Sequence, residues 1–428
     1  TDLVNFAEEH PVSFTTPGHH NGNFYTRHPA GEVFKNFFGD NFLYADVSDT
    51  IPELGDTLTH GGTPLTAEKQ AAKAFNADKV YFCTNGTTSS NTICATAALT
   101  EGDLVLFDRN NHKSLYNSAL VMTGAKPVYL KTDRDPLGLI GPLVEKDLDE
   151  KNIRQQIAMV DPKKAKAKRP FRLAVLQLET YDGVFYDAHY LIKKLGPLCD
   201  YILFDCAWGG YERFVDLMRQ LSPLSLEYGP DDPGILVTQS VHKQQAGVAQ
   251  TSQILKKDAH LKGQKRYIDH KHFNNAYLKY VTTSYSYPIY ASLAVNAAMA
   301  ASQANRAWWE ETLVKGIEFR KKLLHQSKLF KPLVPTKING ISWENIPTEK
   351  LATDLSLWQL DPKDTWHGFN KVALGEAIIS PLKLTITSPG VDLKTGKYTE
   401  TGIVSPLVGE FLIEKRIIPG KADLYSTL

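Results

Sequence analysis

Three side chains suited to joint chemistry follow a short apolar stretch in the middle of the sequence. Residues 235–239 predict a buried strand, and Ser240, His242 and Lys243 come directly after it. Burial at a strand end disfavours a charged ammonium, so it lowers the pKa and makes Lys243 a candidate Schiff-base amine. A second apolar stretch ends in Asp205. An amine and a carboxylate at neighbouring strand ends are what pyridoxal phosphate (PLP) needs, as imine partner and as counter-charge for the ring nitrogen.

A candidate phosphate site lies earlier in the sequence. Gly86, Thr87 and Thr88 follow the predicted strand 79–83 and open an apolar helix that runs to about residue 98. Unpaired backbone N–H groups, hydroxyls and the positive end of a helix together suit a phosphate monoester. The alternative interpretation is an N-terminal capping cluster without a ligand, and this stretch alone favours neither.

Two further strand ends carry candidates that each have two interpretations. His112 follows the predicted strand 104–108 and either stacks on a planar ring or caps the next helix. Thr180 follows the predicted strand 173–178 and starts a turn that ends at Gly183. It either contacts a cofactor or only closes a tight turn, because glycine readily ends such turns.

Short apolar strands alternate with helices from residue 64 onward. This alternation predicts an α/β fold with a doubly wound, mostly parallel sheet, whose functional residues lie at the carboxyl ends of the strands. The predicted strands are 79–83, 104–108, 127–130, 173–178, 201–205, 235–239 and 248–255. The predicted helices are 66–76, the stretch to residue 98, 112–123, 146–160, 188–195 and a long helical region at 290–324.

The chain is long enough for more than one core. We expect an extended lead-in at 1–62, a large PLP-binding domain at 63–290, a bridging helical region at 291–330 and a smaller α+β domain at 331–428. In the last of these, 383–387 predicts a strand and 404–415 a helix. The sequence starts without methionine and the last domain is predicted to be incomplete, so we expect a longer polypeptide.

Composition limits which classes of binding partner and which cellular compartment we expect. A formal net charge of +1 gives no electrostatic reason to expect nucleic acid or a membrane as partner. The four cysteines form no CxxC pair, which favours buried thiols in the cytoplasm over a disulfide framework or zinc. His19 and His20 are adjacent and lack an acidic or cysteine partner at ligand spacing, so no metal site is predicted.

Five motifs in order resemble the bacterial ornithine/lysine/arginine decarboxylases, PLP-dependent enzymes of the aspartate aminotransferase fold (fold type I). They are Thr-Pro-Gly-His-His-x-Gly at 16–22, Asp-Arg-Asn-x-His-Lys-Ser at 108–114, Thr-Tyr-Asp-Gly at 180–183, Phe-Asp-x-Ala-Trp-x-x-Tyr-x-x-Phe at 204–214 and Gln-Ser-x-His-Lys at 239–243. The stretches 240–247 and 269–275 look closest to the biodegradative ornithine decarboxylases.

The resemblance implies a role for each candidate residue. Lys243 would hold PLP as an imine, Asp205 would pair with the pyridinium nitrogen, and His112 would stack on the ring. The other implied contacts are Ala207 on the second face of the ring, Gly86, Thr87, Thr88, Ser240 and His242 around the phosphate, Thr180 and Trp208 near the ring oxygen, and Thr283 and Ser284 at the cofactor of a neighbouring subunit in an obligate homodimer.

The implied reaction is decarboxylation of a basic amino acid, with L-ornithine to putrescine and CO₂ as the first expectation. Lys243 or His242 would return a proton to Cα. Tyr285 stands where relatives usually have proline, and 369–381 lacks their acidic, aromatic pattern, so substrate choice stays open. The alternatives are lysine or arginine as substrate, another PLP reaction such as aminotransfer, elimination or oxidation, and an inactive regulatory subunit. Glu376 and Asp361 are candidates for the substrate's distal cation, although solvated carboxylates are the commoner interpretation.

Overall fold

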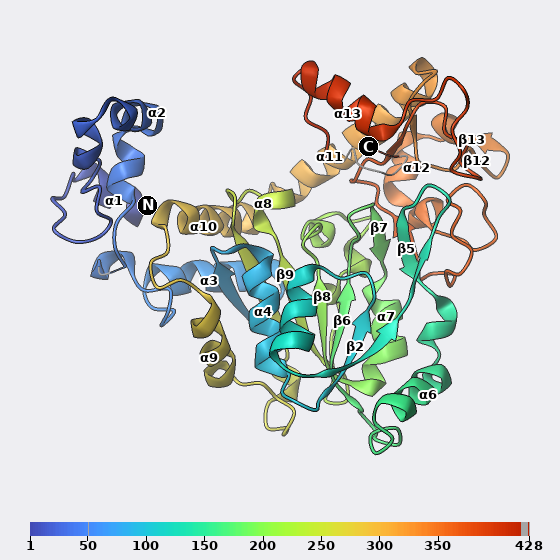
Figure 1. The fold of residues 1–428 in the computed structure, drawn as a ribbon, viewed down its shortest axis with the longest axis horizontal. Helices are drawn as coiled ribbons and strands as arrows, with labels where there is room; N and C mark the ends of the chain where they lie inside the picture. Colours follow the sequence, from blue (N-terminus) through green and yellow to red (C-terminus); the bar gives the residue numbers. More distant parts are fainter. Residues whose placement is uncertain (50, 421–426, 428) are drawn as a thin grey trace.

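A seven-stranded sheet runs through the middle of the chain (Figure 1). We analysed a computed structural model, which describes residues 1–49, 51–420 and 427. Four neighbouring strand pairs are parallel, and only β10 runs against its neighbours. In sheet order the strands are β1 (Lys79–Cys83), β10 (Ser252–Lys257), β9 (Gly234–Gln239), β8 (Cys199–Asp205), β6 (Phe171–Gln177), β2 (Leu104–Asp108) and β3 (Lys126–Leu130).

Both faces of the sheet are covered, as a doubly wound fold requires. Side chains alternate along each strand, so Val80 and Phe82 of β1 enter one core while Tyr81 and Cys83 enter the other. Helices α3 (Thr63–Phe75), α6 (Glu150–Val160) and α7 (Ala188–Leu195) contribute to the first core, and α4 (Gly86–Ala98) and α9 (His270–Tyr280) contribute to the second. The predicted fold class is therefore confirmed.

Two elements predicted within residues 63–290 differ from the structure. The strand predicted at 248–255 begins only at Ser252, because residues 248–251 form the turn that leads into β10. The helix predicted at 112–123 is a short α-helix, α5 (Lys113–Leu115), followed by a π-helical stretch at Tyr116–Met122. Short strands β4 (Thr132–Arg134) and β5 (Ile140–Leu143) form a separate hairpin.

The long helical region predicted at 290–324 is two helices. α10 (Tyr287–Ala301) and α11 (Asn305–Gln326) are separated by a break at residues 302–304. Beyond α11 the described residues form short strands and two α-helices; the strand predicted at 383–387 covers only two residues, and the helix predicted at 404–415 is observed as α13 (Ser405–Glu414). These elements are β11 (Lys331–Pro332), β12 (Lys337–Ile338), β13 (Ile341–Ser342), α12 (Thr348–Thr353), β14 (Ala377–Ile379), β15 (Ile386–Thr387) and α13 (Ser405–Glu414). β14 pairs with β7 (Val184–Tyr186) of the large unit.

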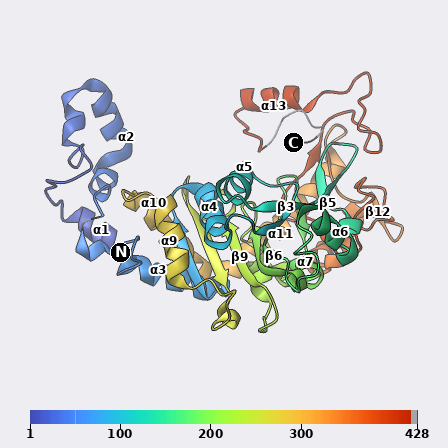
Figure 2. The same cartoon turned by 60° about the horizontal axis from the view of Figure 1, so that its bottom comes forward.

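The extended lead-in predicted at 1–62 is wrong in its local structure, because α1 (Asp2–Glu8) and α2 (Pro29–Ala45) are helices. The rings of Phe34, Phe38 and Phe42 contact one another in tilted pairs along α2, at helical spacing. Gly39 interrupts that helix with a φ of 80°, and because glycine is a poor helix former its presence argues against a helix in the sequence. Both helices stand off from the sheet at one end of the molecule (Figures 1 and 2). Across the described part of the chain, no helix combines the length and apolarity needed to span a bilayer.

Candidate active site

The predicted chemistry-bearing residues converge on one cavity at the carboxyl edge of the parallel strands. Its volume is about 620 Å³. Its walls come from the segments that follow β1, β2, β6, β8 and β9, because parallel strands deliver their carboxyl ends to the same edge of a sheet. The lining residues are Asn85, Gly86, Thr87, Thr88, Asn91, Asn110, Asn111, His112, Gln177, Tyr181, Asp205, Ala207, Trp208, Ser240, His242, Lys243 and Gln250.

Lys243 lies on a single helical turn, α8 (Val241–Gln244), directly after β9. Its Nζ is 3.9 Å from the centroid of the Trp208 ring, a cation–π distance. Desolvation by the surrounding side chains lowers the pKa of Lys243, and the Asp205 carboxylate opposes part of that shift. The amine therefore opens onto the cavity and loses its proton more readily than a free lysine.

Asp205 ends β8 and is almost wholly buried, with 2% of its surface exposed. Asn91 Nδ2 donates to its Oδ2 at 3.0 Å, and the backbone N–H of Ala207 donates to Oδ1 at 3.0 Å. Burial raises the pKa of Asp205, while these two donors and the nearby Lys243 and His112 oppose the shift. The carboxylate is thus held in a fixed orientation beside two basic groups.

The N-terminus of α4 opens onto the cavity without a side-chain cap. Gly86 begins it with a φ of 72°, a conformation that glycine adopts readily, and its N–H donates to Gln250 O. Thr87 Oγ1 and Ser240 Oγ are 2.6 Å apart and join α4 to the end of β9. The capping interpretation is therefore not what the structure shows, and the remaining first-turn N–H groups and hydroxyls form a cradle for an anion.

His112 caps the next helix, as one of its interpretations predicts, while stacking on a cofactor ring stays a prediction. Its Nδ1 accepts from the backbone N–H of Ser114 and so caps α5, and its ring also lines the cavity. Desolvation lowers the pKa of His112, which keeps the imidazole neutral. His242 Nδ1 is 2.7 Å from Thr251 O, a carbonyl that can only accept, so this nitrogen carries the proton and Nε2 is the ring atom left for other contacts.

Three predicted contacts lie outside this cavity. Thr180 is fully buried, and its hydroxyl accepts from the Val184 N–H in a tight turn, while the adjacent Tyr181 lines the cavity instead. Thr283 and Ser284 are exposed on the segment between α9 and α10. Their contact with the cofactor of a neighbouring subunit stays a prediction, as does the contact of Thr180.

Sequence reasoning missed several amides of the cavity. Asn91 is the most consequential, because it also accepts from Thr238 Oγ1 at 2.7 Å and so ties α4 to β9. An asparagine inside an apolar helix is an available signal, since it is a poor helix former. Asn111 has a buried Oδ1 without a hydrogen-bond partner in the part of the chain that the structure describes. The other missed lining residues are Asn85, Asn110, Gln177, Tyr181 and Gln250.

Asp108 organises the loop that carries His112. It accepts from the Asn110 N–H at 2.8 Å and from the Gln177 N–H at 3.3 Å, and burial raises its pKa to about 7. Neither Glu376 nor Asp361 lines the cavity. Glu376 is fully buried and accepts from the Ala373 N–H, so it is neither a solvated carboxylate nor a wall of this site.

The arrangement fits PLP on three counts. A lysine amine of lowered pKa, a buried carboxylate and an uncapped helix N-terminus with two hydroxyls line one cavity. These groups match an imine partner, a counter-charge for a ring nitrogen and an anion cradle. Within residues 1–49, 51–420 and 427, no group of three or more histidine, cysteine or acidic side chains is placed to hold a metal ion.

Comparison with known proteins gives matches over the whole chain. The family model described as Orn/Lys/Arg decarboxylase, major domain, matches residues 1–428. The inducible ornithine decarboxylase of Lactobacillus sp. (strain 30a) is 50% identical over 427 residues, which cover 100% of this chain and 58% of that protein. The inducible ornithine decarboxylase of Escherichia coli is 47% identical over 426 residues, which cover 100% of this chain and 58% of that protein.

Among solved structures, lysine decarboxylase A from Pseudomonas aeruginosa superposes with a TM-score of 0.86 at 34% identity. The match covers 99% of this chain and 55% of that structure. The chain thus spans less than two thirds of the length of the proteins it matches.

Proposed function

Because the chain belongs to the Orn/Lys/Arg decarboxylase family, we propose that it catalyses the PLP-dependent decarboxylation of a basic amino acid, with L-ornithine as the first candidate. The observation that carries this proposal is the presence of Lys243, Asp205 and the uncapped N-terminus of α4 in one cavity. The preference for ornithine rests on relatives of 47–50% identity that bear that name, against 35% or less for lysine and arginine decarboxylases.

The residues of the cavity would hold the cofactor in defined ways. When bound, PLP supplies an electron sink for the electron pair that remains at Cα as CO₂ leaves. Lys243 binds it through its amine, whose lowered pKa favours the neutral, reactive form. Asp205 would hold a proton at the ring nitrogen, and His112 and Ala207 would contact the two faces of the ring. Gly86, Thr87, Thr88, Ser240 and His242 would hold the phosphate, and Trp208 would lie near the ring oxygen.

Proton return to Cα is assigned to Lys243, with His242 as the alternative. Lys243 is favoured because its amine opens onto the cavity and titrates below the ordinary lysine range. His242 keeps Nδ1 on Thr251 O, so only Nε2 is placed to carry a proton toward the cavity.

The assembly belongs to the same proposal. We place Thr283 and Ser284 of one protomer at the cofactor of its partner in a homodimer, since both are exposed and outside the cavity of their own chain. We keep the division into 1–62, 63–290, 291–330 and 331–428 as a proposal. We also propose a cytoplasmic location, which the four buried cysteines without disulfides support.

The test measures CO₂ and amine from the purified protein with PLP, offered ornithine, lysine and arginine in parallel. Putrescine with CO₂ from ornithine, abolished in Lys243→Ala, is the expected result. Lys194→Ala changes an exposed lysine on α7 and is the matched control, which should keep full activity. A keto acid instead of CO₂ would replace decarboxylation by another reaction at the same site, and a protein that does not bind PLP would remove the proposal.

A further inference from the structure

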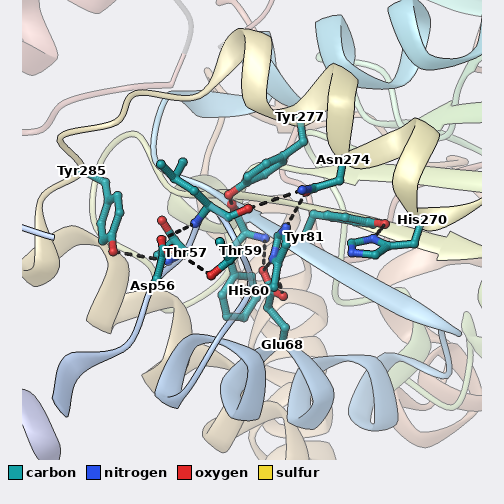
Figure 3. A network of polar contacts seen from close by, with 12 residues as sticks. Asp56, Thr57, Thr59, His60, Glu68, Tyr81, His270, Asn274, Tyr277 and Tyr285 are labelled. Atoms are coloured by element: carbon teal, nitrogen blue, oxygen red, sulfur yellow. Dashed lines mark hydrogen bonds and ion pairs between the residues drawn. The ribbon is translucent and has the colours of Figure 1, made fainter. Parts of the chain in front are cut away.

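His60 is a buried histidine outside the cavity, and both of its ring nitrogens are engaged (Figure 3). Nδ1 lies 2.9 and 3.0 Å from the two carboxylate oxygens of Glu68, and Nε2 lies 2.8 Å from Asn274 Oδ1. The rings of Tyr81 and Tyr277 pack around the imidazole at centroid distances of 5.2 and 5.0 Å. Four elements therefore meet at this one side chain: the loop 55–62, α3, β1 and α9.

Each ring nitrogen of His60 has a polar side chain within hydrogen-bond distance. Glu68 Oε1 also accepts from the Phe82 N–H at 3.1 Å, so this carboxylate acts as an acceptor. Asn274 Nδ2 is directed at Leu58 O, which leaves its oxygen for His60. The contact between His60 and Glu68 is buried on both sides, and it fixes the ring in place because losing either partner would leave a buried polar group without a hydrogen bond.

The loop that carries His60 is closed and conformationally demanding. Asp56 and Gly61 exchange backbone hydrogen bonds of 3.2 and 2.8 Å. His60 itself has a φ of 54°, in the left-handed region that side chains with a Cβ seldom adopt. Residues in such conformations persist where their surroundings over-determine them, and they concentrate at functional sites.

Two arms run from His60 to the two ends of the segment 281–284. One arm is Asn274 on α9, the helix that ends at Tyr280 just before that segment. The other is the loop itself: the Thr57 N–H donates to Tyr285 Oη at 3.3 Å, and Tyr287 Oη donates to Gly55 O at 3.1 Å. Thr283 and Ser284 lie between these anchors and are exposed.

We propose that His60 is a positioning residue that braces both ends of the segment 281–284 and so sets Thr283 and Ser284 for the cofactor of the partner protomer. This inference rests on the proposed function and its shared dimer site. The same inference assigns a role to Tyr285, because its hydroxyl accepts from the Thr57 N–H and a proline at this position could not.

The first test measures PLP retention by absorbance, without any turnover. Asn274→Ala removes the contact of His60 with α9, and Tyr285→Phe removes one of the two hydrogen bonds that join the loop to the segment after Ser284. We expect each to weaken PLP binding by about tenfold, since a misplaced binding group costs on the order of this factor or more. Asn274→Asp keeps an acceptor for His60 Nε2 and should recover part of the loss. His272→Gln, on the same helix but bonded to Ala97 O, is the matched control and should bind PLP as the unmodified protein does.

The second test determines whether the substitution impairs the active site of its own protomer or that of the partner protomer. Mixed dimers of an Asn274→Ala chain with a Lys243→Ala chain have one site with an intact Lys243, and its Thr283 and Ser284 come from the chain with an intact brace. We expect this site to work normally, at half the activity of the unmodified dimer. Mixed dimers of a doubly substituted chain, Asn274→Ala with Lys243→Ala, and an unmodified chain should lose activity by about tenfold relative to that half value.

Each outcome separates this inference from the proposed function. Unchanged PLP retention in both arm variants overturns the brace while decarboxylation stands. Equal losses in the two kinds of mixed dimer overturn it as well, because they show a general structural defect. A protein that binds PLP but releases no CO₂ overturns the proposed reaction, and the PLP retention measurements still decide on the brace.

Discussion

Asn91 Nδ2 donates to Asp205 Oδ2 at 3.0 Å and thereby links the helix that carries the anion cradle to the strand that carries the buried carboxylate. The same Asn91 accepts from Thr238 Oγ1 on the next strand. A single amide thus sets the distance between the two groups proposed to hold opposite ends of the cofactor.

Replacing Asn91 by leucine should raise the pKa of Asp205 further, because the first of the forces that oppose desolvation is removed. A protonated Asp205 would not hold a charged ring nitrogen. We expect kcat/KM to fall on the order of tenfold to a hundredfold, consistent with the loss of a charge-assisted hydrogen bond. Steady-state kinetics with PLP in excess measures this effect. Thr92→Ala, one residue along the same helix, should leave kcat/KM unchanged.

The lowered pKa of Lys243 predicts the pH range in which its amine reacts with PLP. The rate at which PLP forms its imine with the apoprotein should rise with pH and level off below the ordinary lysine value of 10.5, because desolvation favours the neutral amine. In Asp205→Asn the midpoint should move lower still, since the Asp205 carboxylate is what raises this pKa. Stopped-flow absorbance across pH 6–10 measures both midpoints. A rate that still rises steeply at pH 10, without levelling off, would contradict the environment described for Lys243.

We expect Glu376 to make the free energy of unfolding depend on pH. Burial raises its pKa to about 8 from 4.5, so in the folded protein it holds a proton that the unfolded chain has released. Its contribution is therefore fully present below the unfolded pKa and is lost as pH rises to about 8, by at most about 1.4 kcal/mol per pH unit. Urea denaturation at several pH values between 5 and 8 should show a shallower decline for Glu376→Gln. Parallel curves for the two proteins would refute this account.

Arg320 on α11 binds the backbone of residues 380–383 and so anchors the C-terminal segment to that helix. Its buried guanidinium donates to Pro381 O at 2.7 Å, to Ser380 O at 3.2 Å and to Lys383 O at 2.7 Å, and burial lowers its pKa to about 9. Arg320→Met should lower the free energy of unfolding by about 2–3 kcal/mol, because these carbonyls lose their donors. Lys322→Met, an exposed neighbour, should change it by less than about 0.5 kcal/mol.

Most of the sheet was predictable because its signals are local. β1, β2 and α7 begin and end where apolar runs do, and parallel strands then place Lys243 and Asp205 at one edge without further assumptions. Asn91 was not predicted, because its importance depends on Asp205, a residue far away in the sequence. The helical character of α2 was missed because Gly39, a poor helix former, argues against a helix there. The proposed contacts of Thr283 and Ser284 would involve a second chain, so only the family resemblance suggests them.

The pairing of β14 with β7 means that one wall of the cavity depends on a strand made much later than the central sheet. The seven strands of the central sheet are complete once Lys257 has left the ribosome, so the sheet can assemble first. The turn that places Tyr181 beside the cavity leads directly into β7, whose partner strand ends only at Ile379. That wall of the cavity can therefore be completed only after Ile379 has been made, whereas Lys243 and Asp205 follow or end strands of the earlier sheet.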